Sequence, residues 1–357
     1  MVFIIKLIDK YVGNLMCNFI SLFNKKKPCD VKFGKILVVQ LWGIGETILT
    51  LPAIEALRKK FPEAEINILA TPRNNGIYYK NKNIKKYDLV IDMEEYLNVS
   101  VIMSFFVGYK IIGYSHNSRA KLYTSKIKYN DAQHAAQTFL DLVRSLGINY
   151  GIHKLPKLNF SKSDKNFVDK LLKGSEIKNS EFVVCIAPGA AESAKARIWP
   201  LGMYAELSDE IIAKHDAKVI FVGSLDESGL ISYIQNAMEN KNKTINTGGK
   251  ITLNQLFYLI SRCNLFIGND AGPMHIAAAQ GIKTLGLFGP NIPLRFGPYG
   301  KGNIGLYKGY NCEFSPCINV HKGQVPDCLY TKNSNDYQKC MKNISVDDVL
   351  KEIEKLV

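Results

Sequence analysis

The chain has 357 residues, which at about 100 to 200 residues per domain predicts two domains, each large enough to bury its own core. Hydrophobic residues make up 46% of the sequence and charged residues 22%, so a disordered tail protein and a polytopic membrane protein are both excluded. The formal net charge of +14 favours anionic partners such as nucleotides, phosphorylated glycans, lipid headgroups or nucleic acid.

Two further features of the composition narrow these classes. No arginine-rich helix or aromatic platform accompanies the positive charge, so we expect no nucleic-acid partner. Eight cysteines are too few for a disulfide-dense secreted scaffold, and no cleavable export signal precedes them. We therefore expect a cytoplasmic protein.

Residues 1–34 form a separate amphipathic segment in this prediction. Apolar side chains recur at helical spacing over residues 1–23 and leave one polar face, while three charges within the first ten positions argue against a membrane-spanning helix. Because the basic run Lys25–Lys27 follows, the helix is expected either to lie on an anionic membrane surface, at the inner face of the inner membrane, or to pack on the protein's own body. The sequence leaves both alternatives open.

From residue 35 onward, apolar strands alternate with helical runs. The first array has predicted strands at 36–41, 66–69, 89–92 and 110–112, with a helix at 47–60. After a polar segment around 155–180, strands follow at 182–187, 218–222, 265–268 and 284–287, and a last helix covers 346–357. This pattern predicts an α/β fold of two Rossmann-like, doubly wound domains, 35–170 and 171–345, facing each other across a cleft.

The loop after the first strand contains Gly43, Gly45 and Glu46. A dinucleotide-binding fingerprint would need a third glycine at position 48, which is Ile48, and an acidic residue at the end of the second strand, which is also missing. This argues against a nicotinamide-dependent oxidoreductase. Glu46 is then either a general base at the mouth of the cleft or a first-turn acid that complements the helix dipole.

Two later loops have the composition of an anion site. The loop at 188–190 is followed by Lys195 and Arg197, which would hold an anionic group over the sheet edge. In the other loop, Pro273 stands where a helix begins, so the free amides there favour a diphosphate, and Asp270 beside them would accept hydrogen bonds from sugar hydroxyls.

No DxD pair is present to hold a nucleotide-bound divalent ion, so a leaving diphosphate would be neutralised by amides and cations. The last fifth of the chain carries four cysteines without short CxxC pairs: Cys312, Cys317, Cys328 and Cys340. Structural zinc and free buried thiols both remain open for this set.

Several of these motifs, in this order, resemble those of glycosyltransferase family 9, the ADP-heptose:lipopolysaccharide heptosyltransferases and their relatives. The resemblance covers roughly residues 35–350 and rests on the segment 36–57, the turn 188–190 with Trp199 and Pro200, and the segment 270–275. It implies a GT-B fold and an inverting, metal-independent transfer that needs no cofactor. It also implies an N-terminal acceptor domain and a C-terminal domain for a nucleotide-diphosphate sugar.

The resemblance carries residue roles with it. Glu46 stands at the family's catalytic aspartate, with Gly43 and Gly45 in the acceptor-side loop. The donor-binding positions would be Lys195, Arg197, Glu227, Asp270, Ala271, Gly272, Pro273, Met274 and His275, although His275 by itself reads as a buried, satisfied histidine. Three positions depart from the family pattern: Glu46 replaces Asp, Arg197 replaces Lys, and Ala271 replaces Thr.

The function expected from this resemblance is transfer of a sugar, foremost heptose from ADP-heptose, to a lipopolysaccharide core or a related glycolipid or oligosaccharide acceptor. Glu46 would remove the proton of the acceptor hydroxyl while the nucleoside diphosphate leaves toward Arg197 and Lys195. The departures at Glu46 and Ala271 keep one alternative open, a non-catalytic nucleotide-sugar-binding or assembly protein of the same fold.

Overall fold

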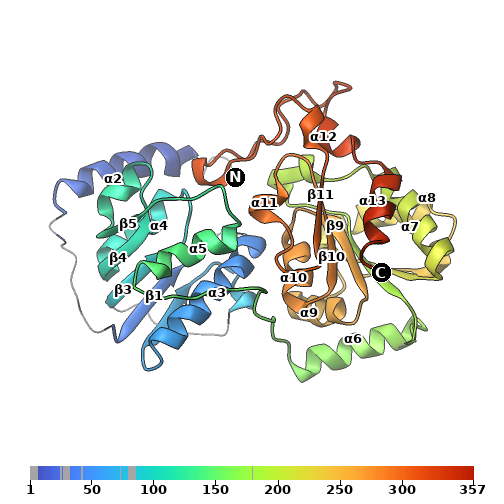
Figure 1. Cartoon of the computed structure of the whole chain (residues 1–357), viewed down its shortest axis with the longest axis horizontal. Helices are drawn as coiled ribbons and strands as arrows, with labels where there is room; N and C mark the ends of the chain where they lie inside the picture. Colours follow the sequence, from blue (N-terminus) through green and yellow to red (C-terminus); the bar gives the residue numbers. More distant parts are fainter. Residues whose placement is uncertain are drawn as a thin grey trace. The chain divides into compact units, whose positions relative to one another are not determined.

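The computed structural model describes residues 7–24, 26, 33–41, 43–72, 74–78, 86–178 and 180–357, without the side chains of residues 75, 192, 193 and 321 (Figure 1). Trp42 of the glycine loop, Lys25 and Lys27 of the basic run, and residues 1–6 of the amphipathic segment lie outside the described residues. The chain divides into two compact units, Met1–Ile152 with Val320–Gly323, and His153–Asn319 with Gln324–Val357.

The N-terminal unit contains a five-stranded parallel sheet in the order β2-β1-β3-β4-β5. Its strands are β1 (Lys35–Val39), β2 (Glu65–Leu69), β3 (Tyr87–Asp92), β4 (Gly108–Tyr114) and β5 (Ser125–Ile127). Its helices are the π-helix η1 (Asp9–Gly13), α2 (Asn14–Ser21), α3 (Ile44–Lys60), η2 (Asn75–Ile77), α4 (Asn98–Val107), η3 (Ser118–Leu122) and α5 (Ala135–Arg144).

Alternate residues of the central strands face opposite layers of this unit. Leu37, Val39 and Val90 pack with Val101 of α4 and with Cys17 of α2 in one buried cluster. Helices α3 and α5 pack on each other. Since β1 lies between β2 and β3, the strand order reverses between β1 and β3, and ligands of doubly wound sheets bind at the carboxyl ends of such a strand pair.

The C-terminal unit contains a six-stranded parallel sheet in the order β11-β10-β9-β6-β7-β8. Its strands are β6 (Val183–Ala187), β7 (Lys218–Phe221), β8 (Thr244–Asn246), β9 (Leu265–Asn269), β10 (Lys283–Phe288) and β11 (Ile304–Tyr307). Its α-helices are α6 (Lys162–Gly174), α7 (Leu201–His215), α8 (Ser228–Ala237), α9 (Leu253–Ser261), α10 (Gly272–Gln280), α11 (Pro293–Phe296), α12 (Lys339–Lys342) and α13 (Val346–Ile353). Its 3-10 helices are η4 (Glu192–Arg197), η5 (Leu225–Glu227), η6 (Lys241–Lys243) and η7 (Gly309–Asn311), while the later η8 (Val320–Lys322) belongs to the N-terminal unit.

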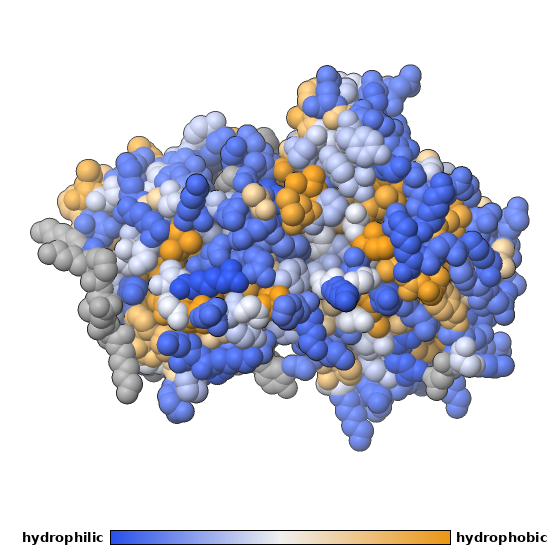
Figure 2. Space-filling view, in the orientation of Figure 1, coloured by the Kyte–Doolittle hydropathy of each residue, from blue (hydrophilic) through white to orange (hydrophobic). Residues whose placement is uncertain are grey.

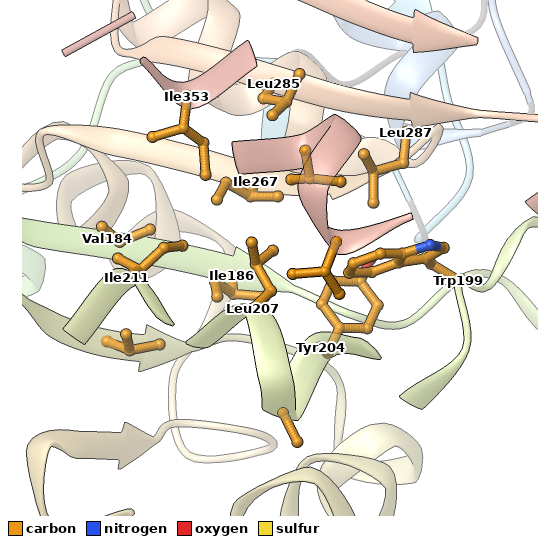
Figure 3. Close-up of a cluster of buried hydrophobic side chains, with 14 of the residues drawn as sticks. Val184, Ile186, Trp199, Tyr204, Leu207, Ile211, Ile267, Leu285, Leu287 and Ile353 are labelled. Carbon is orange, nitrogen blue, oxygen red and sulfur yellow. The ribbon is translucent and has the colours of Figure 1, made fainter. Parts of the chain in front are cut away.

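Figure 3 shows part of the core of the C-terminal unit, where strand residues such as Val184, Ile186 and Ile267 meet side chains of α7 and α13. Trp199 is fully buried at one end of this core, in edge-to-face contact with Tyr204, and its indole N–H donates to the Ile344 carbonyl at 2.9 Å. In this sheet the strand order reverses between β6 and β9, so a second ligand position is expected at the carboxyl ends of those two strands.

The predicted fold of two doubly wound α/β units is confirmed. Strands β5, β8 and β11, which lie at sheet edges, are not among the predicted strands. The units divide between Ile152 and His153, whereas the predicted boundary, between residues 170 and 171, falls inside α6. This helix packs on α9 and belongs wholly to the C-terminal unit. Helix α13 packs on α7 and contributes Val349 and Ile353 to the same core. Among the described residues, no helix combines the length and the apolarity that crossing a membrane requires.

Candidate active site

The loop between β1 and α3 brings the Glu46 carboxylate over a glycine. Gly43 has φ +53°, a conformation that favours glycine, and precedes the first residue of α3. A Cβ added to Gly43 would lie 1.7 Å from Glu46 Oε2, so the carboxylate occupies the space that any other residue at position 43 would fill. Glu46 is half-buried, and Gly45 lies in the same first turn of α3.

A buried asparagine, Asn74, which is not among the predicted site residues, fixes this loop. The Asn74 amide nitrogen donates to the Gln40 carbonyl and to Thr47 Oγ1, both at 2.9 Å, and Asn74 Oδ1 accepts from the Thr71 amide at 2.8 Å. Thr47 Oγ1 in turn donates to the Gly43 carbonyl at 2.6 Å. Asn74 therefore acts as a positioning residue for the turn that carries Glu46.

Two more carboxylates follow β3 on the other side of the strand-order reversal. Glu94 is buried and accepts a hydrogen bond from the Leu41 amide, just before the glycine loop. Burial, with the charge of Asp92 as a smaller cause, raises the pKa of Glu94 to about 8. The neighbouring Glu95 carboxylate accepts from the Tyr129 hydroxyl, so acidic and aromatic side chains gather at this sheet edge.

Tyr96 lies among these acids. Burial raises the pKa of its hydroxyl, and the charges of Glu94, Glu46 and Glu95 raise it further. A Cβ added to Gly323 would lie 3.3 Å from Tyr96 Cδ2, so the short segment Val320–Gly323 belongs to the N-terminal unit and rests against this ring. Glu94, Glu95 and Tyr96 are not among the predicted site residues, although their position directly after a predicted strand is a signal for a site.

In the C-terminal unit, the Asn269 side chain at the end of β9 forms hydrogen bonds to the loop after β6 and to the residues around the start of α7. Its amide nitrogen donates to the carbonyls of Pro188 and Gly189, at 2.8 and 3.2 Å. Its carbonyl oxygen accepts from the Trp199 amide at 3.1 Å and from the Tyr204 hydroxyl at 3.0 Å. The loop after β6, the residues before α7 and the end of β9 are thereby held as one structure.

Arg197 and Asp270 meet beside Asn269. Arg197 Nη1 lies 3.2 Å from Asp270 Oδ2 and donates to the Asp270 carbonyl at 3.0 Å, and the Asn291 amide donates to Asp270 Oδ2 at 3.0 Å. Arg197 Nε and Asn291 Oδ1 are buried and have no hydrogen-bond partner among the described residues. Because buried polar atoms are rarely left unpaired, this cluster has the character of a binding site.

The Glu227 carboxylate lies against the loop after β6. A Cβ added to Gly189 would lie 1.9 Å from Glu227 Oε1, and Glu227 Oε2 accepts from the Ser224 amide at 2.6 Å. Three of the predicted donor-binding side chains, Glu227, Arg197 and Asp270, thus surround the carboxyl ends of the strands where the order reverses.

Helix α10 begins at Gly272, after Ala271 as N-cap and with Pro273 in its first turn, as the sequence predicted. Met274 is fully buried, and a Cβ added to Gly286 would lie 2.4 Å from its Sδ, so its side chain packs α10 onto β10. His275 is also buried. Lys195 is exposed, and its carbonyl accepts from the Gln338 amide at 3.0 Å.

The segment with the four late cysteines supports the Arg197 loop. The Asp327 carboxylate accepts from the Ala196 amide at 3.0 Å, and the Ile318 amide donates to the Pro290 carbonyl at 3.0 Å. Burial raises the pKa of Cys317 to about 11 and of Cys340 to about 12, and the neighbouring late cysteines raise both pKa values further. No three His, Cys, Asp or Glu residues of the described part of the chain are placed to hold a metal ion.

Comparison with known proteins identifies the family of this chain. The family model described as Glycosyltransferase family 9 (heptosyltransferase) matches residues 81–322. The chain belongs to this family. It is therefore a glycosyltransferase, and the resemblance inferred from its motifs is confirmed.

Individual relatives are distant but match along most of their length. The family 9 chain is 23% identical over 333 residues to lipooligosaccharide heptosyltransferase 2 of Campylobacter jejuni, covering 90% of this chain and 99% of that protein. The crystal structure of a family 9 glycosyl transferase from Veillonella parvula has a TM-score of 0.75 at 22% identity, covering 92% of this chain and 98% of the other. For E. coli ADP-heptose lps heptosyltransferase II the TM-score is 0.69 at 19% identity, covering 90% and 98%. The predicted GT-B fold is confirmed.

Proposed function

We propose that this family 9 member transfers heptose from ADP-heptose to a lipopolysaccharide or lipooligosaccharide core, with inversion and without a metal ion. The observation that carries the proposal is the Arg197–Asp270–Asn291 cluster, whose Arg197 Nε and Asn291 Oδ1 are buried without a hydrogen-bond partner among the described residues. The names of the Campylobacter jejuni and E. coli relatives support the choice of sugar and acceptor.

On the donor side, Arg197 supplies the fixed cation of the proposed site. Its guanidinium is held by Asp270, so its orientation is set before the donor binds. The diphosphate lies against Arg197, Lys195 and the first turn of α10 from Gly272, where backbone amides favour negative charge. Glu227 accepts hydrogen bonds from the ribose hydroxyls, beside Gly189.

On the acceptor side, Glu46 acts as the general base. Its carboxylate removes the proton of the acceptor hydroxyl, whose oxygen forms a bond to the anomeric carbon of the donor from the opposite face. The bond between that carbon and the diphosphate oxygen breaks, and its electron pair leaves with ADP.

The decisive experiment compares the wild type with Glu46→Gln, using ADP-heptose and a heptose-deficient core acceptor. General-base assistance is typically worth about 10² to 10⁴ in rate, so we expect kcat to fall by at least about 10² with a much smaller change in KM. The measurements are ADP release and the anomeric configuration of the product. Near-normal turnover in the variant would remove Glu46 from the chemistry, and donor binding without ADP release would favour the non-catalytic alternative.

The four late cysteines take no part in this step, and we propose that they are free thiols that stabilise the support of the Arg197 loop. The placement of the described side chains does not fit a tetrahedral zinc site. Metal analysis of the purified protein should find far less than one equivalent of zinc; a full equivalent would restore the zinc alternative.

We also propose that the protein works at the inner face of the inner membrane, where a glycolipid acceptor is anchored. The amphipathic segment supports this placement, because its apolar side chains remain exposed in η1 and α2.

A further inference from the structure

The N-terminal helices η1 and α2 attach to the protein through polar and small residues. Asp9 caps helix α4 from outside: the Asn98 amide donates to Asp9 Oδ2 and the Val99 amide to Asp9 Oδ1, both at 2.8 Å. Two turns along, Cys17 is fully buried, with its Sγ 3.8 Å from Asn98 Oδ1. The segment is therefore anchored on the N-terminal unit rather than extended into solvent.

The same inner face continues along α2. A Cβ added to Gly13 would lie 2.7 Å from Asn98 Cβ, so η1 and α4 approach closely at this glycine. Asn14 accepts from the Ser118 hydroxyl, and Asn18 Oδ1 accepts from Lys121 Nζ at 2.8 Å. Ile20 packs against the apolar cluster that contains Cys17 and Leu122, so hydrogen bonds and a narrow apolar contact together hold this helix to η3.

The outer face is also apolar, whereas the outer face of an ordinary surface helix is polar. Leu15 is 70% and Leu22 79% exposed. They belong to a row of exposed large apolar side chains that includes Ile8, Tyr11, Leu15, Phe19, Leu22 and Phe23. Figure 2 shows hydrophobic colour at the upper left, where α2 lies in Figure 1.

Helix α4 adds to this face. It packs beside η1 and α2, and its Val99, Met103 and Phe106 recur one helical turn apart and are exposed, Phe106 at 67%. Tyr109, directly after the helix, is also exposed. Lys26 Nζ donates to the carbonyls of Phe105 and Gly108 at the C-terminal end of α4 and lies 4.5 Å from the centroid of the Phe105 ring.

The sequence segments that form and follow these helices carry mainly basic charges. Between Glu95 and Asp131 the sequence has no acidic residue, but it has four lysines: Lys110, Lys121, Lys126 and Lys128. Residues 10–29 also lack acids and include the run Lys25–Lys27. The single acid on the helical segment η1–α2 is Asp9, which is used as the cap of α4.

We propose that the exposed face of η1, α2 and α4 is a docking surface for a bilayer that contains anionic lipids. Exposed Leu and Phe side chains enter the boundary of the acyl chains while surrounding lysines meet the headgroups. A second copy of this chain is a poorer occupant, because a two-fold contact through this face would oppose two basic surfaces. The inference deepens the proposed function, since it says which surface brings the enzyme to a lipid-anchored acceptor.

The test is flotation of the full chain with vesicles of phosphatidylethanolamine and phosphatidylglycerol, compared with phosphatidylcholine alone. We expect binding to the anionic vesicles that weakens in high salt. Leu15→Ser, Phe19→Ser and Leu22→Ser together should lower the partition coefficient at least about 100-fold, because these side chains carry much of the inserted apolar area. Phe106→Ser alone should lower it by about 10-fold.

The matched control is Leu225→Ser with Tyr233→Ser, two exposed apolar residues of the C-terminal unit, which should bind vesicles like the wild type. Circular dichroism checks that each variant is folded. Equal binding by the triple variant and the control overturns the proposal. So does a concentration-dependent dimer that the triple variant dissociates while vesicle binding is absent. The assay contains no donor or acceptor, so its failure leaves the proposed transfer reaction untouched.

Discussion

Position 43 requires glycine for two reasons, the conformation of its backbone and the space that the Glu46 carboxylate occupies. Gly43 has a positive φ and also leaves room for the Glu46 carboxylate, whose Oε2 would lie 1.7 Å from an added Cβ. Gly147 also has a positive φ, of +72°, but nothing lies within 4 Å of its added Cβ. Substituting each glycine therefore distinguishes the effect of backbone strain, which both variants have, from the effect of displacing the Glu46 carboxylate, which only the Gly43 variant has.

Gly43→Ala should reduce kcat by at least about 10-fold, because the new methyl group forces the Glu46 carboxylate away from its position. Gly147→Ala should have a similar strain cost of about 1 kcal/mol and retain wild-type turnover. Steady-state kinetics and thermal melting of both variants provide the comparison. Equal turnover in the two variants would show that the position of the Glu46 carboxylate over Gly43 is unimportant.

The raised pKa of Glu94 predicts that the free energy of unfolding depends on pH. Its pKa rises from the ordinary 4.5 to about 8 in the folded protein, so the folded state keeps a proton that the unfolded state releases between these values. This group therefore lowers the free energy of unfolding as pH rises from about 4.5 to 8. Glu94→Gln cannot ionise but keeps an oxygen to accept from the Leu41 amide.

We accordingly expect Glu94→Gln to gain stability relative to the wild type between about pH 5 and pH 8, measured by urea unfolding at both values. The sign of the change is the test. A variant whose disadvantage grows with pH would mean that Glu94 is ionised and stabilising in the folded protein.

The sequence predicts the candidate site residues in glycine-containing loops, but it does not predict the residues that hold these loops in place. Glu46, Arg197 and Asp270 follow predicted strands, and the structure brings Arg197 and Asp270 together. Asn74 and Asn291 were not predicted, because a lone asparagine in a loop has no periodicity and acts only through partners distant in the sequence. The family motif predicts that Met274 contacts the donor, whereas in the structure its buried side chain packs α10 onto β10.

Among the elements, α4 depends on a cap that comes from another helix. Its own N-cap residue, Leu97, makes no side-chain hydrogen bond, and Asp9 accepts from the first two amides of the helix instead. Asp9→Ala should lower the free energy of unfolding by about 1 to 2 kcal/mol, because two amides lose their acceptor and the helix dipole loses an adjacent negative charge.

The measurement is urea unfolding, with Glu63→Ala, an exposed acid of the same unit, as the control that should change stability by less than about 0.5 kcal/mol. If both variants lose the same free energy of unfolding, the effect comes from the change in net charge and not from the loss of the helix cap.

The elements themselves were predictable where strands are long and apolar. Strands β1, β6 and β9 lie inside their sheets and read as continuous apolar runs, as buried parallel strands do. Strands β5 and β8 have three residues each, are only partly buried at a sheet edge and carry polar residues, so no periodicity could reveal them. The amphipathic helix was predicted, but its orientation depends on hydrogen bonds to residues about 90 positions away.

Over the whole molecule, each unit has a reversal of strand order with polar side chains at its carboxyl edge, and the proposal gives the two edges different ligands. ADP should therefore slow amide hydrogen exchange in the C-terminal unit around residues 187–198, 268–275 and 289–291, since a ligand stabilises the structure that binds it. Residues 43–47 should exchange as before. Mass spectrometry of the full chain with and without ADP measures both regions, and protection centred on 43–47 would reverse the assignment of the units.

The segment Val320–Gly323 belongs to the N-terminal unit, whereas the residues on either side of it belong to the C-terminal unit. The polypeptide therefore passes between the units three times, and neither unit is a continuous stretch of the gene. A chimera that exchanges the whole N-terminal unit between two family members has to transplant two pieces, the first 152 residues and this tetrapeptide, or Tyr96 will meet a foreign neighbour in place of Gly323.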